Sequence, residues 1–364
     1  MEIWVPYGDV ESLLTLQAEN LGELVDPAPE GHAEELSLIL KERTKGFERL
    51  IICDSKPTTL KLLKALAPHI PQDSALKLNA PSPKSVEDGV PGLKGRVTKL
   101  SPPSVAFASG GAEVKLPPEL AQGKNLFLAT GEPDPLFGYS DARVAAALSY
   151  LTGARRVAYD AREGDAPAFL QDTKAYTALV SLLEGARESS YVTLITKGGE
   201  PVSMIDGGAK DAKGHFFQQQ LNPAKGIAVG AGGRGYDDTF SSLLRLAMGT
   251  LGAVRKGGDV LLIGECREGI GSDALQMQAQ GRISEGSLRR GFYADGMEEI
   301  GYLKRLKDDY SVTLLSSLPD LYASGRFKFR AAKSAGEALQ KVFSSAGRGA
   351  KLHVFTRASE TLLA

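Results

Sequence analysis

The sequence predicts an α/β fold built from two α/β domains whose sheets are mostly parallel. Short runs rich in Val, Ile and Leu recur between longer helical patterns, which is typical of strands buried on both faces of a parallel sheet. The chain has 364 residues, of which 42% are hydrophobic and 24% charged, so it can bury one large core or two medium ones. No repeat of fixed period and no low-complexity tract occurs, which excludes solenoid and disordered proteins.

Apolar runs predict the main strands in chain order. They are RLIIC ending at Cys53, NLFLA ending at Ala129, RRVAY ending at Tyr159, GIAVGA ending at Ala231, DVLLIG ending at Gly264, SVTLL ending at Leu315 and KLHVF ending at Phe355. Helical patterns fill most of the gaps between these runs.

Two further segments predict hairpins. Between Asn79 and Pro118 the sequence becomes rich in Pro, Ser and Gly, and the pieces SVAFAS and AEVKL flank the pair Gly110 and Gly111. This stretch predicts loop and hairpin. YVTLIT and PVSMID flank the turn KGGE, which predicts a second hairpin, and a helix through 216–220 is expected after it.

The segment LNPAKG predicts the joint between the domains, at Asn222 and Pro223. We therefore expect an N-terminal α/β domain over 1–222 and a C-terminal domain over 223–364, with the last residues able to pack back on the first domain. Strands and helices alternate after the joint, which predicts a doubly wound sheet of about four parallel strands. A cleft is expected where the two domains face each other.

Composition excludes several function classes. Lys and Arg total 43 against 44 for Asp and Glu, so the net charge of -1 offers no field that would attract nucleic acid or an anionic membrane. Two distant cysteines exclude a disulfide scaffold, and the four histidines form no HxxH or HExxH pair, so no metal site is predicted. The first residues lack the features of a signal peptide and no apolar run reaches about 18 residues. We expect a cytoplasmic protein without a membrane partner.

Candidate ligand-binding residues follow the predicted strands, because ligands of open parallel sheets bind beyond the carboxyl ends of the strands. They are Asp54, Lys56, Glu132, Ser140 and Arg143 in the first half and Gly232, Gly233, Glu265, Arg267, Gly269 and Gly271 in the second. Lys56 and Arg143 are predicted to hold an anionic group, and the glycine backbones to support the ligand. Asp134 and Asp160 are candidates for acid and base catalysis; helix capping or turn formation is the alternative.

Two glycine-rich loops are candidate binding elements. GAGGRG spells GxGxxG between a strand and a helix, but Glu265 comes later than the roughly 20 residues expected for a ribose-binding acid, and Asp237 at the helix start would repel a phosphate. A tight strand-to-helix turn is therefore favoured over a dinucleotide site. GECREGIGS combines Gly269 and Gly271 with Arg267 and Glu265 and predicts binding or a capped turn about equally. Its Cys266 is expected to be a buried structural thiol.

The chain resembles the lactate racemase family on several of these motifs. WVPYGD, IICDSKPT and GEPDPLFGYSDAR lie near family landmarks in the first half, and GAGGRGYDDTF and GECREGIGS lie near landmarks in the second. The resemblance implies two α/β domains, a cleft between them, and a nickel-pincer nucleotide tethered to a lysine.

The departures from the family fall on the residues that carry its chemistry. The resemblance places family histidines at Pro81, Asp134 and Asp160, and the tethering lysine at Val144. Valine cannot form the covalent link, and carboxylate replaces imidazole poorly at a soft nickel site. The cofactor is therefore unknown, and a nickel-pincer nucleotide is implied only by the resemblance.

We expect a divergent protein of this kind that binds a small organic anion or nucleotide-like ligand in the cleft without a covalent cofactor. One alternative is a 2-hydroxy acid racemase or epimerase, an isomerase, that holds a nickel-pincer nucleotide non-covalently. Another is a non-catalytic sensor, and a distant one is an NAD-dependent dehydrogenase. Whether the chain is an enzyme, which ligand it takes and how it oligomerises stay open at this point.

Overall fold

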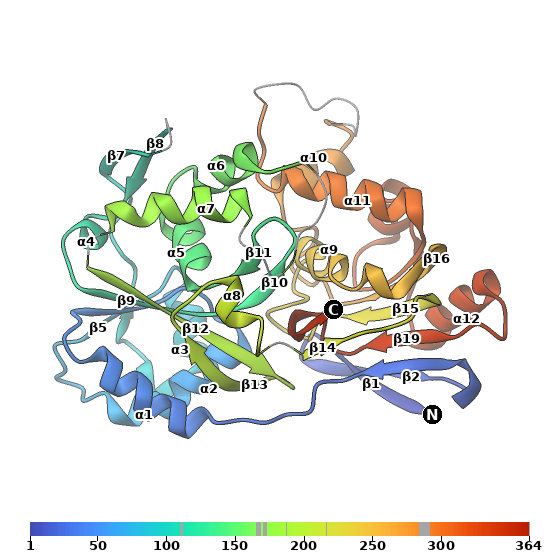
Figure 1. Ribbon diagram of the computed structural model, residues 1–364, viewed down its shortest axis with the longest axis horizontal. Coiled ribbons are helices and arrows are strands. Elements are labelled where there is room, and N and C mark those ends of the chain that lie inside the picture. The colour runs from blue at the N-terminus through green and yellow to red at the C-terminus, as the bar shows by residue number, and fades with distance from the viewer. Residues whose placement is uncertain are drawn as a thin grey trace. The chain divides into compact units, whose positions relative to one another are not determined.

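A computed structural model describes residues 1–109, 112–164, 169, 173–186, 188–215, 217–283 and 292–363 (Figure 1). The chain forms two compact units. The terminal unit contains Met1–Pro27 and the chain from Phe217 onward, and the central unit contains Ala28–Gly164 and most of the chain from 168 to 216. Each unit is built on a six-stranded sheet that is entirely or mostly parallel, so the predicted fold class is confirmed.

The terminal unit has a parallel sheet in the order β18-β17-β16-β15-β19-β3. Its strands are β15 (Ala224–Gly230), β16 (Val254–Ile263), β17 (Ser311–Leu315), β18 (Arg330–Ala332), β19 (Leu352–Phe355) and β3 (Leu21–Val25). Its helices are α9 (Phe240–Met248), α10 (Asp273–Ala279), α11 (Met297–Asp309) and α12 (Ala335–Ala346). The four strands predicted for this half, GIAVGA, DVLLIG, SVTLL and KLHVF, are confirmed, and β18 and β3 extend the sheet to six.

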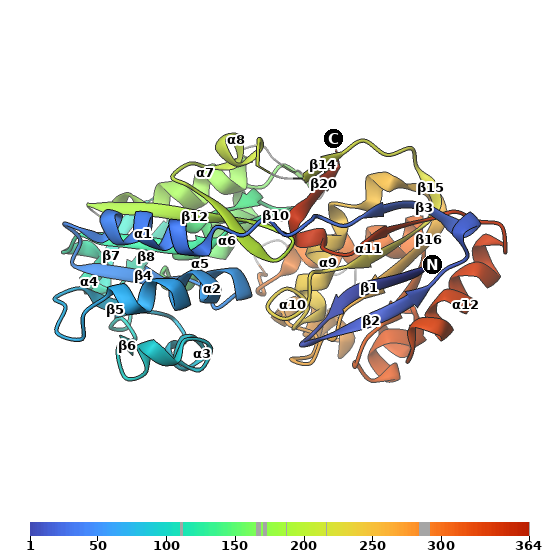
Figure 2. The ribbon, with the colours of Figure 1, turned by 90° about the horizontal axis from the view of Figure 1, so that it is seen from below.

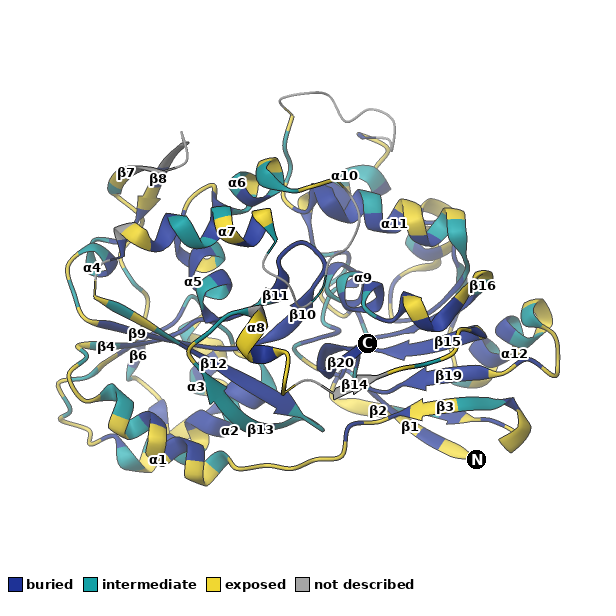
Figure 3. Cartoon of the chain, viewed as in Figure 1, coloured by how far each residue is buried: buried dark blue, intermediate teal, exposed yellow. Residues whose placement is uncertain are grey.

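Both faces of this sheet are covered, which explains the continuous apolar run of β16. Leu261 and Ile263 pack with Ala338 of α12 and with Val5 of an N-terminal hairpin in one core. Successive side chains of a strand point to opposite faces, so Val260 and the other alternate residues face the helices α9 and α11. Figure 1 shows these two helices on the opposite side of the sheet from the hairpin, and Figure 3 shows the central strands β15 and β19 as mostly buried.

The units divide the chain differently from the predicted boundary after 222. The hairpin β1 (Glu2–Tyr7) and β2 (Val10–Thr15), followed by β3, belongs to the C-terminal half, as Figure 2 shows. β3 pairs in parallel with β19, more than 300 positions later in the chain. Such long-range pairing leaves no local sign in the sequence, and the predicted joint lies only a few residues from the place where the chain enters the terminal unit.

The central unit has the sheet order β13-β12-β9-β4-β5-β6, in which only the β12–β13 pair is antiparallel. Its strands are β4 (Arg49–Ile52), β5 (Lys77–Asn79), β6 (Val97–Thr98), β9 (Asn125–Thr130), β12 (Ser189–Lys197) and β13 (Glu200–Ile205). The longer helices are α1 (Ala33–Thr44), α2 (Pro57–Leu66), α5 (Ala142–Tyr150), α6 (Ala154–Ala161) and α7 (Lys174–Ser181). The predicted strands RLIIC and NLFLA and the hairpin around KGGE are confirmed.

Two cores lie on the two faces of the central sheet. Ile51 packs in a core with residues of α5 and α7, whereas Leu50 and Ile52 pack in another with residues of α1 and α2. This alternation accounts for a strand that is apolar at every position.

The run RRVAY was wrongly predicted as a strand, since it lies in α6. Gly153 precedes the helix with φ +78°, and Ala154 and Ala158, four positions apart, are the residues that α6 buries. A run of three apolar residues fits a strand and one turn of helix equally well, so periodicity could not separate them.

The helix expected over 216–220 is also wrong. Phe217–Gln219 forms a strand, β14, that pairs with β20 (Thr361–Leu363), while Phe216 lies outside the described residues. The last residues of the chain therefore pack on β14, within the terminal unit.

The stretch between Asn79 and Pro118 is more regular than expected. It contains the predicted hairpin, β7 (Val105–Ser109) and β8 (Ala112–Leu116), with Gly110 and Gly111 outside the described residues. It also contains a helix that was not predicted, α3 (Pro83–Gly89). The remaining short elements are α4 (Pro118–Ala121), β10 (Glu132–Asp134), β11 (Gly138–Ser140) and α8 (Ala209–Ala212). Among the described helices, none is both long and apolar enough to span a membrane.

Candidate functional site

The central unit has a hollow of about 490 Å³ beside the edge of β12. β13 stops at Ile205, opposite Thr193, so within the described chain no strand pairs with 189–192 on that side. Ser189, Ser190 and Tyr191 therefore line the hollow together with Phe47, Leu126, Val192 and three charged residues, Arg43, Arg143 and Asp206. Two guanidinium groups and one carboxylate give this lining a net positive charge.

Arg143 is held in place by a buried pair of side chains. Asp141 caps the N-terminus of α5, where its Oδ1 accepts the main-chain N–H groups of Arg143 and Val144, both at 2.9 Å. Its Oδ2 accepts the hydroxyl of Tyr176 at 2.8 Å, and Tyr176 accepts Nη1 of Arg143 at 3.3 Å. Asp141 and Tyr176 are almost fully buried, so they hold the guanidinium group of Arg143 in a fixed position.

The interactions of Arg143 with Asp141 and Tyr176 favour its charged form. Burial raises the pKa of Asp141, although hydrogen bonds from Val144 and Tyr176 oppose that shift. Burial alone would lower the pKa of Arg143, but the interactions with Tyr176 and Asp141 outweigh it and raise the pKa. The guanidinium is therefore a fixed cation with N–H groups left to bind a ligand, because the two bonds from its Nη atoms use only part of its five donors.

Asp206, which follows β13, contacts both guanidinium groups. Its main-chain carbonyl accepts Nη2 of Arg143 at 2.8 Å, and its carboxylate forms an ion pair with Arg43 in the last turn of α1. The side chain of Asp206 is 68% exposed and that of Arg43 is 34% exposed. Arginine binds planar carboxylates and phosphates with two parallel hydrogen bonds, so this arrangement suits an anionic ligand.

The structure brings together three other predicted residues, Asp54, Lys56 and Glu132, at the carboxyl ends of β4 and β9. Asp54 accepts the main-chain N–H groups of Thr130 at 2.6 Å and of Lys56 at 3.0 Å. The ammonium of Lys56 lies 2.6 Å from the carboxylate of Glu132, and both side chains are largely buried. This cluster joins two strand ends, and none of its members lines the hollow with Arg143.

The two carboxylates predicted for proton transfer have different surroundings. Asp134 is buried and accepts the main-chain N–H groups of Leu136 at 2.8 Å and Phe137 at 3.1 Å, in the turn between β10 and β11. Asp160 is exposed on α6 and lies 3.7 Å from Arg156 in an ion pair. Ser140 ends β11, opposite Glu132. Asp134 thus has the turn-forming role that the sequence left open as the alternative.

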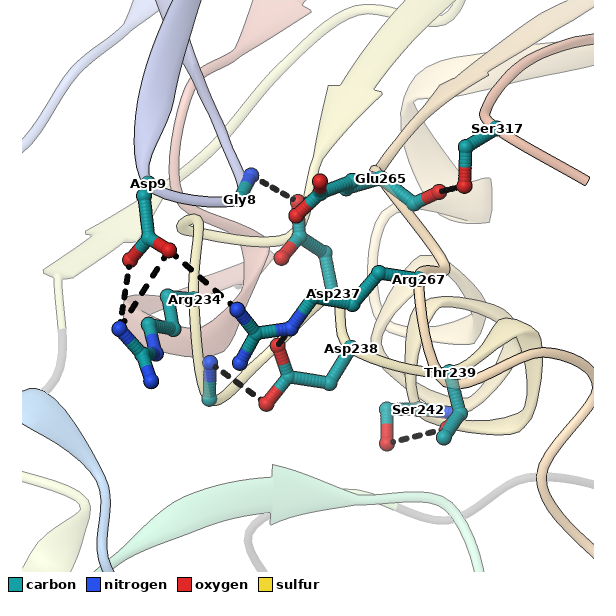
Figure 4. Close-up of polar contacts among 11 residues, drawn as sticks. Gly8, Asp9, Arg234, Asp237, Asp238, Thr239, Ser242, Glu265, Arg267 and Ser317 are labelled. Carbon is teal, nitrogen blue, oxygen red and sulfur yellow. Dashed lines mark hydrogen bonds and ion pairs between the residues drawn. The ribbon is translucent and has the colours of Figure 1, made fainter.

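In the terminal unit, the loops after β1, β15 and β16 meet in a polar cluster (Figure 4). Asp9 lies between two arginines, with its oxygens 3.0 Å from Arg234 and 3.3 Å from Arg267, and Arg267 also lies 3.3 Å from Asp238. The predicted residue Glu265 donates its main-chain N–H to the carboxylate of Asp237 at 3.1 Å.

The glycine-rich loop after β15 forms a tight turn. Two of its main-chain N–H groups have acceptors in the protein: that of Arg234 donates to the carbonyl of Gly8 at 2.9 Å, and that of Gly235 donates to Asp238 at 3.1 Å. Gly232 and Gly233 have φ of +124° and +83°, and a Cβ would lie 2.7 Å from Ser359 or 3.0 Å from Pro6. These glycines are needed for backbone conformation and close packing.

The glycines of the loop after β16 divide into two kinds. Gly271 has φ +97°, and a Cβ there would lie 2.6 Å from Ser241, so it packs against the start of α9. Gly269 has φ +90° with open space where a Cβ would be. Between them and the strand lies Cys266, which is buried, and burial together with Asp237 and Glu265 raises the pKa of its thiol. The thiol is thus not activated as a nucleophile.

The positions that the resemblance gives to the nickel-pincer nucleotide do not fit a covalently held cofactor. Val144 is fully buried in the core beneath α5 and offers no amine. The carboxylate of Asp134 accepts main-chain hydrogen bonds in a turn, and Asp160 is exposed on a helix. In the part of the chain that the structure describes, no group of three or more His, Cys, Asp or Glu side chains is placed to hold a metal ion.

Several residues of these clusters were missed from the sequence. Arg43 lies in the last turn of a helix, and Asp206, Asp9 and Arg234 follow or precede short elements, where charged residues are usually solvated. No local signal separates them from other surface charges. Asp141 could have been found, because an Asp directly before the helix ARVAAALSY is typical of an N-cap.

Solved structures support the fold. The lactate racemase apoprotein from Thermoanaerobacterium thermosaccharolyticum is similar over 100% of both chains, with a TM-score of 0.76 and 15% sequence identity. A protein from Thermotoga maritima is similar over 93% of this chain and 100% of its own, with a TM-score of 0.55 and 11% identity. No family model and no curated protein matches the sequence. At these identities the similarity establishes a lactate-racemase-like fold.

Proposed function

We propose that the protein binds a small organic anion in the hollow beside β12, with Arg143 as the anchor. The observation that carries this proposal is that two guanidinium groups, Arg43 and Arg143, line one hollow and that the second is fixed by buried partners. Of the two anion anchors predicted from the sequence, Arg143 lines this hollow, whereas Lys56 is paired with Glu132 elsewhere.

The chemistry of the lining favours a carboxylate. Arg143 supplies a planar set of N–H donors that matches the two oxygens of a carboxylate, and Ser190 adds a hydroxyl group that can donate to a ligand oxygen. Tyr191, which stacks on Phe127 with ring centroids 4.9 Å apart, gives the hollow an aromatic wall for a short apolar body. A small hydroxy or keto acid combines a carboxylate with a short apolar body.

The proposal is tested by titration calorimetry with L-lactate as the probe. Arg143→Ala is expected to weaken binding by about 10-fold to 100-fold, the usual value of a lost charged hydrogen bond. Arg156→Ala is the matched control, because Arg156 is an exposed arginine of the same unit that lies outside the hollow. If wild type binds no lactate, or if Arg143→Ala binds as wild type does, the proposal is wrong.

A second candidate is racemisation or epimerisation of a 2-hydroxy acid, which the similarity to lactate racemase over the full chain favours. Since Val144 cannot tether a cofactor, this activity requires a nickel-pincer nucleotide held non-covalently. The test is chiral chromatography of L-lactate after incubation with the protein and this nucleotide. Formation of D-lactate would favour the isomerase, and unchanged L-lactate with intact binding would favour a binding protein or sensor.

A further inference from the structure

We infer that Asp206 restricts the hollow to ligands with a single negative charge by acting as an internal counter-anion for Arg43. This inference rests on the proposed function, because it concerns the selectivity of the same hollow. It assigns a role in specificity to a residue that neither the sequence motifs nor the fold similarity singled out.

Asp206 contacts Arg143 through its main chain and Arg43 through its side chain. Its carbonyl is fixed by the hydrogen bond from Arg143, at the point where β13 ends and the chain leaves the sheet. Its carboxylate pairs instead with Arg43 of α1. The backbone contact therefore helps to orient the anchor, while the side-chain contact decides how much positive charge the hollow offers.

The charge balance predicts the selectivity. With Asp206 ionised, the two guanidinium groups and one carboxylate leave a net charge of one, which a monoanion on Arg143 neutralises. A dianion would bring its second charge close to the carboxylate of Asp206, and like charges this close repel each other. Because the Asp206 side chain is well exposed, its pair with Arg43 is weak, and removing its charge frees Arg43 for a ligand without breaking the fold.

The experiment compares lactate with malonate, at a pH where both malonate carboxylates are ionised, on wild type and Asp206→Asn. Asparagine keeps the main-chain carbonyl on Arg143 and a side-chain oxygen near Arg43 but removes the charge. We expect malonate to gain at least about 5-fold in affinity and lactate no more than about 2-fold. Asp88→Asn, which makes the same change in net charge at an exposed position of α3 in the same unit and outside the hollow, should leave both affinities unchanged.

Arg43 provides the second control. The gain for malonate should disappear in the double variant Arg43→Ala/Asp206→Asn, because the guanidinium that Asp206 had neutralised is then absent. Equal gains for both probes, or no gain for malonate while lactate still binds through Arg143, would overturn the inference and leave the proposed function standing. Failure of both probes to bind wild type and Asp206→Asn would overturn both.

Discussion

The carboxylate of Asp237 accepts the main-chain N–H of Gly8 at 2.8 Å, although 229 positions separate the two residues. The same oxygen accepts the N–H of Glu265, so one fully buried side chain ties the N-terminal hairpin to the ends of β15 and β16.

Asp237→Ala leaves the N–H groups of Gly8 and Glu265 without this acceptor. We expect a loss of about 1–3 kcal/mol in the free energy of unfolding, measured with urea. Asp9→Ala, which removes only exposed ion pairs, should cost less than about 1 kcal/mol.

Asp237 also predicts a pH dependence of stability. Burial is the main cause that raises its pKa above the ordinary value of 3.8, with Asp238 and Glu265 adding to the shift against the two hydrogen bonds. The folded state therefore binds this proton more tightly than the unfolded state. Its contribution to stability is fully present below pH 3.8 and is lost as the pH rises through the raised pKa.

Asp237→Asn removes this titration while it keeps an acceptor for Gly8. The free energy of unfolding of the variant relative to wild type should thus increase as the pH rises above 3.8. Urea unfolding of both proteins over a series of pH values measures this difference. A difference that stays constant or decreases with pH would contradict the shift assigned to Asp237.

The N-terminal hairpin is predicted to be part of the core of the terminal unit. Leu14 is fully buried with Val5 against the sheet, so Leu14→Ala should cost about 2–5 kcal/mol. Val10→Ala is the matched control, because Val10 is 65% exposed at the end of the same hairpin and should change stability by less than about 0.5 kcal/mol. Equal effects in thermal or urea unfolding would mean that the hairpin does not pack as described.

Removing one member of the buried ion pair Lys56–Glu132 is predicted to lower the free energy of unfolding. Their side chains are only 17% and 11% exposed, so Lys56→Met would leave a carboxylate with little access to water. We expect a loss of about 3 kcal/mol for this variant and a smaller loss for Lys56→Met/Glu132→Gln, in which no charge is left unpaired. Urea unfolding of the two variants provides the comparison, and a double variant less stable than the single one would exclude this account.

The fold was largely predictable because buried parallel strands leave continuous apolar runs. Six of the seven strands predicted from such runs form, and RRVAY does not, because Ala154 and Ala158 lie on one face of a helix that Gly153 starts. The placement of the N-terminal hairpin and the strand β14 was not predictable. Both depend on pairing partners at the other end of the chain, β19 and β20, that no local pattern indicates.

The candidate site was predictable only in part. Arg143 was found because it follows a polar loop at the start of a helix, and its buried partner Tyr176 was missed because a tyrosine in an apolar helix has the pattern of an ordinary core residue. Arg43 and Asp206 lie far from each other in the sequence, and the sheet edge left open by the end of β13 brings them together. Position on a sheet edge follows from strand register, which the sequence alone does not specify.

The most direct test of anion binding at Arg143 is NMR spectroscopy of the arginine side chains during a titration with L-lactate. The Nε–Hε signal of Arg143, assigned as the one missing from the spectrum of Arg143→Lys, should shift progressively and saturate, while the signal of the exposed Arg156 stays in place. Lactate that leaves the Arg143 signal unchanged, or that moves all arginine signals alike, would mean that Arg143 does not anchor a small organic anion.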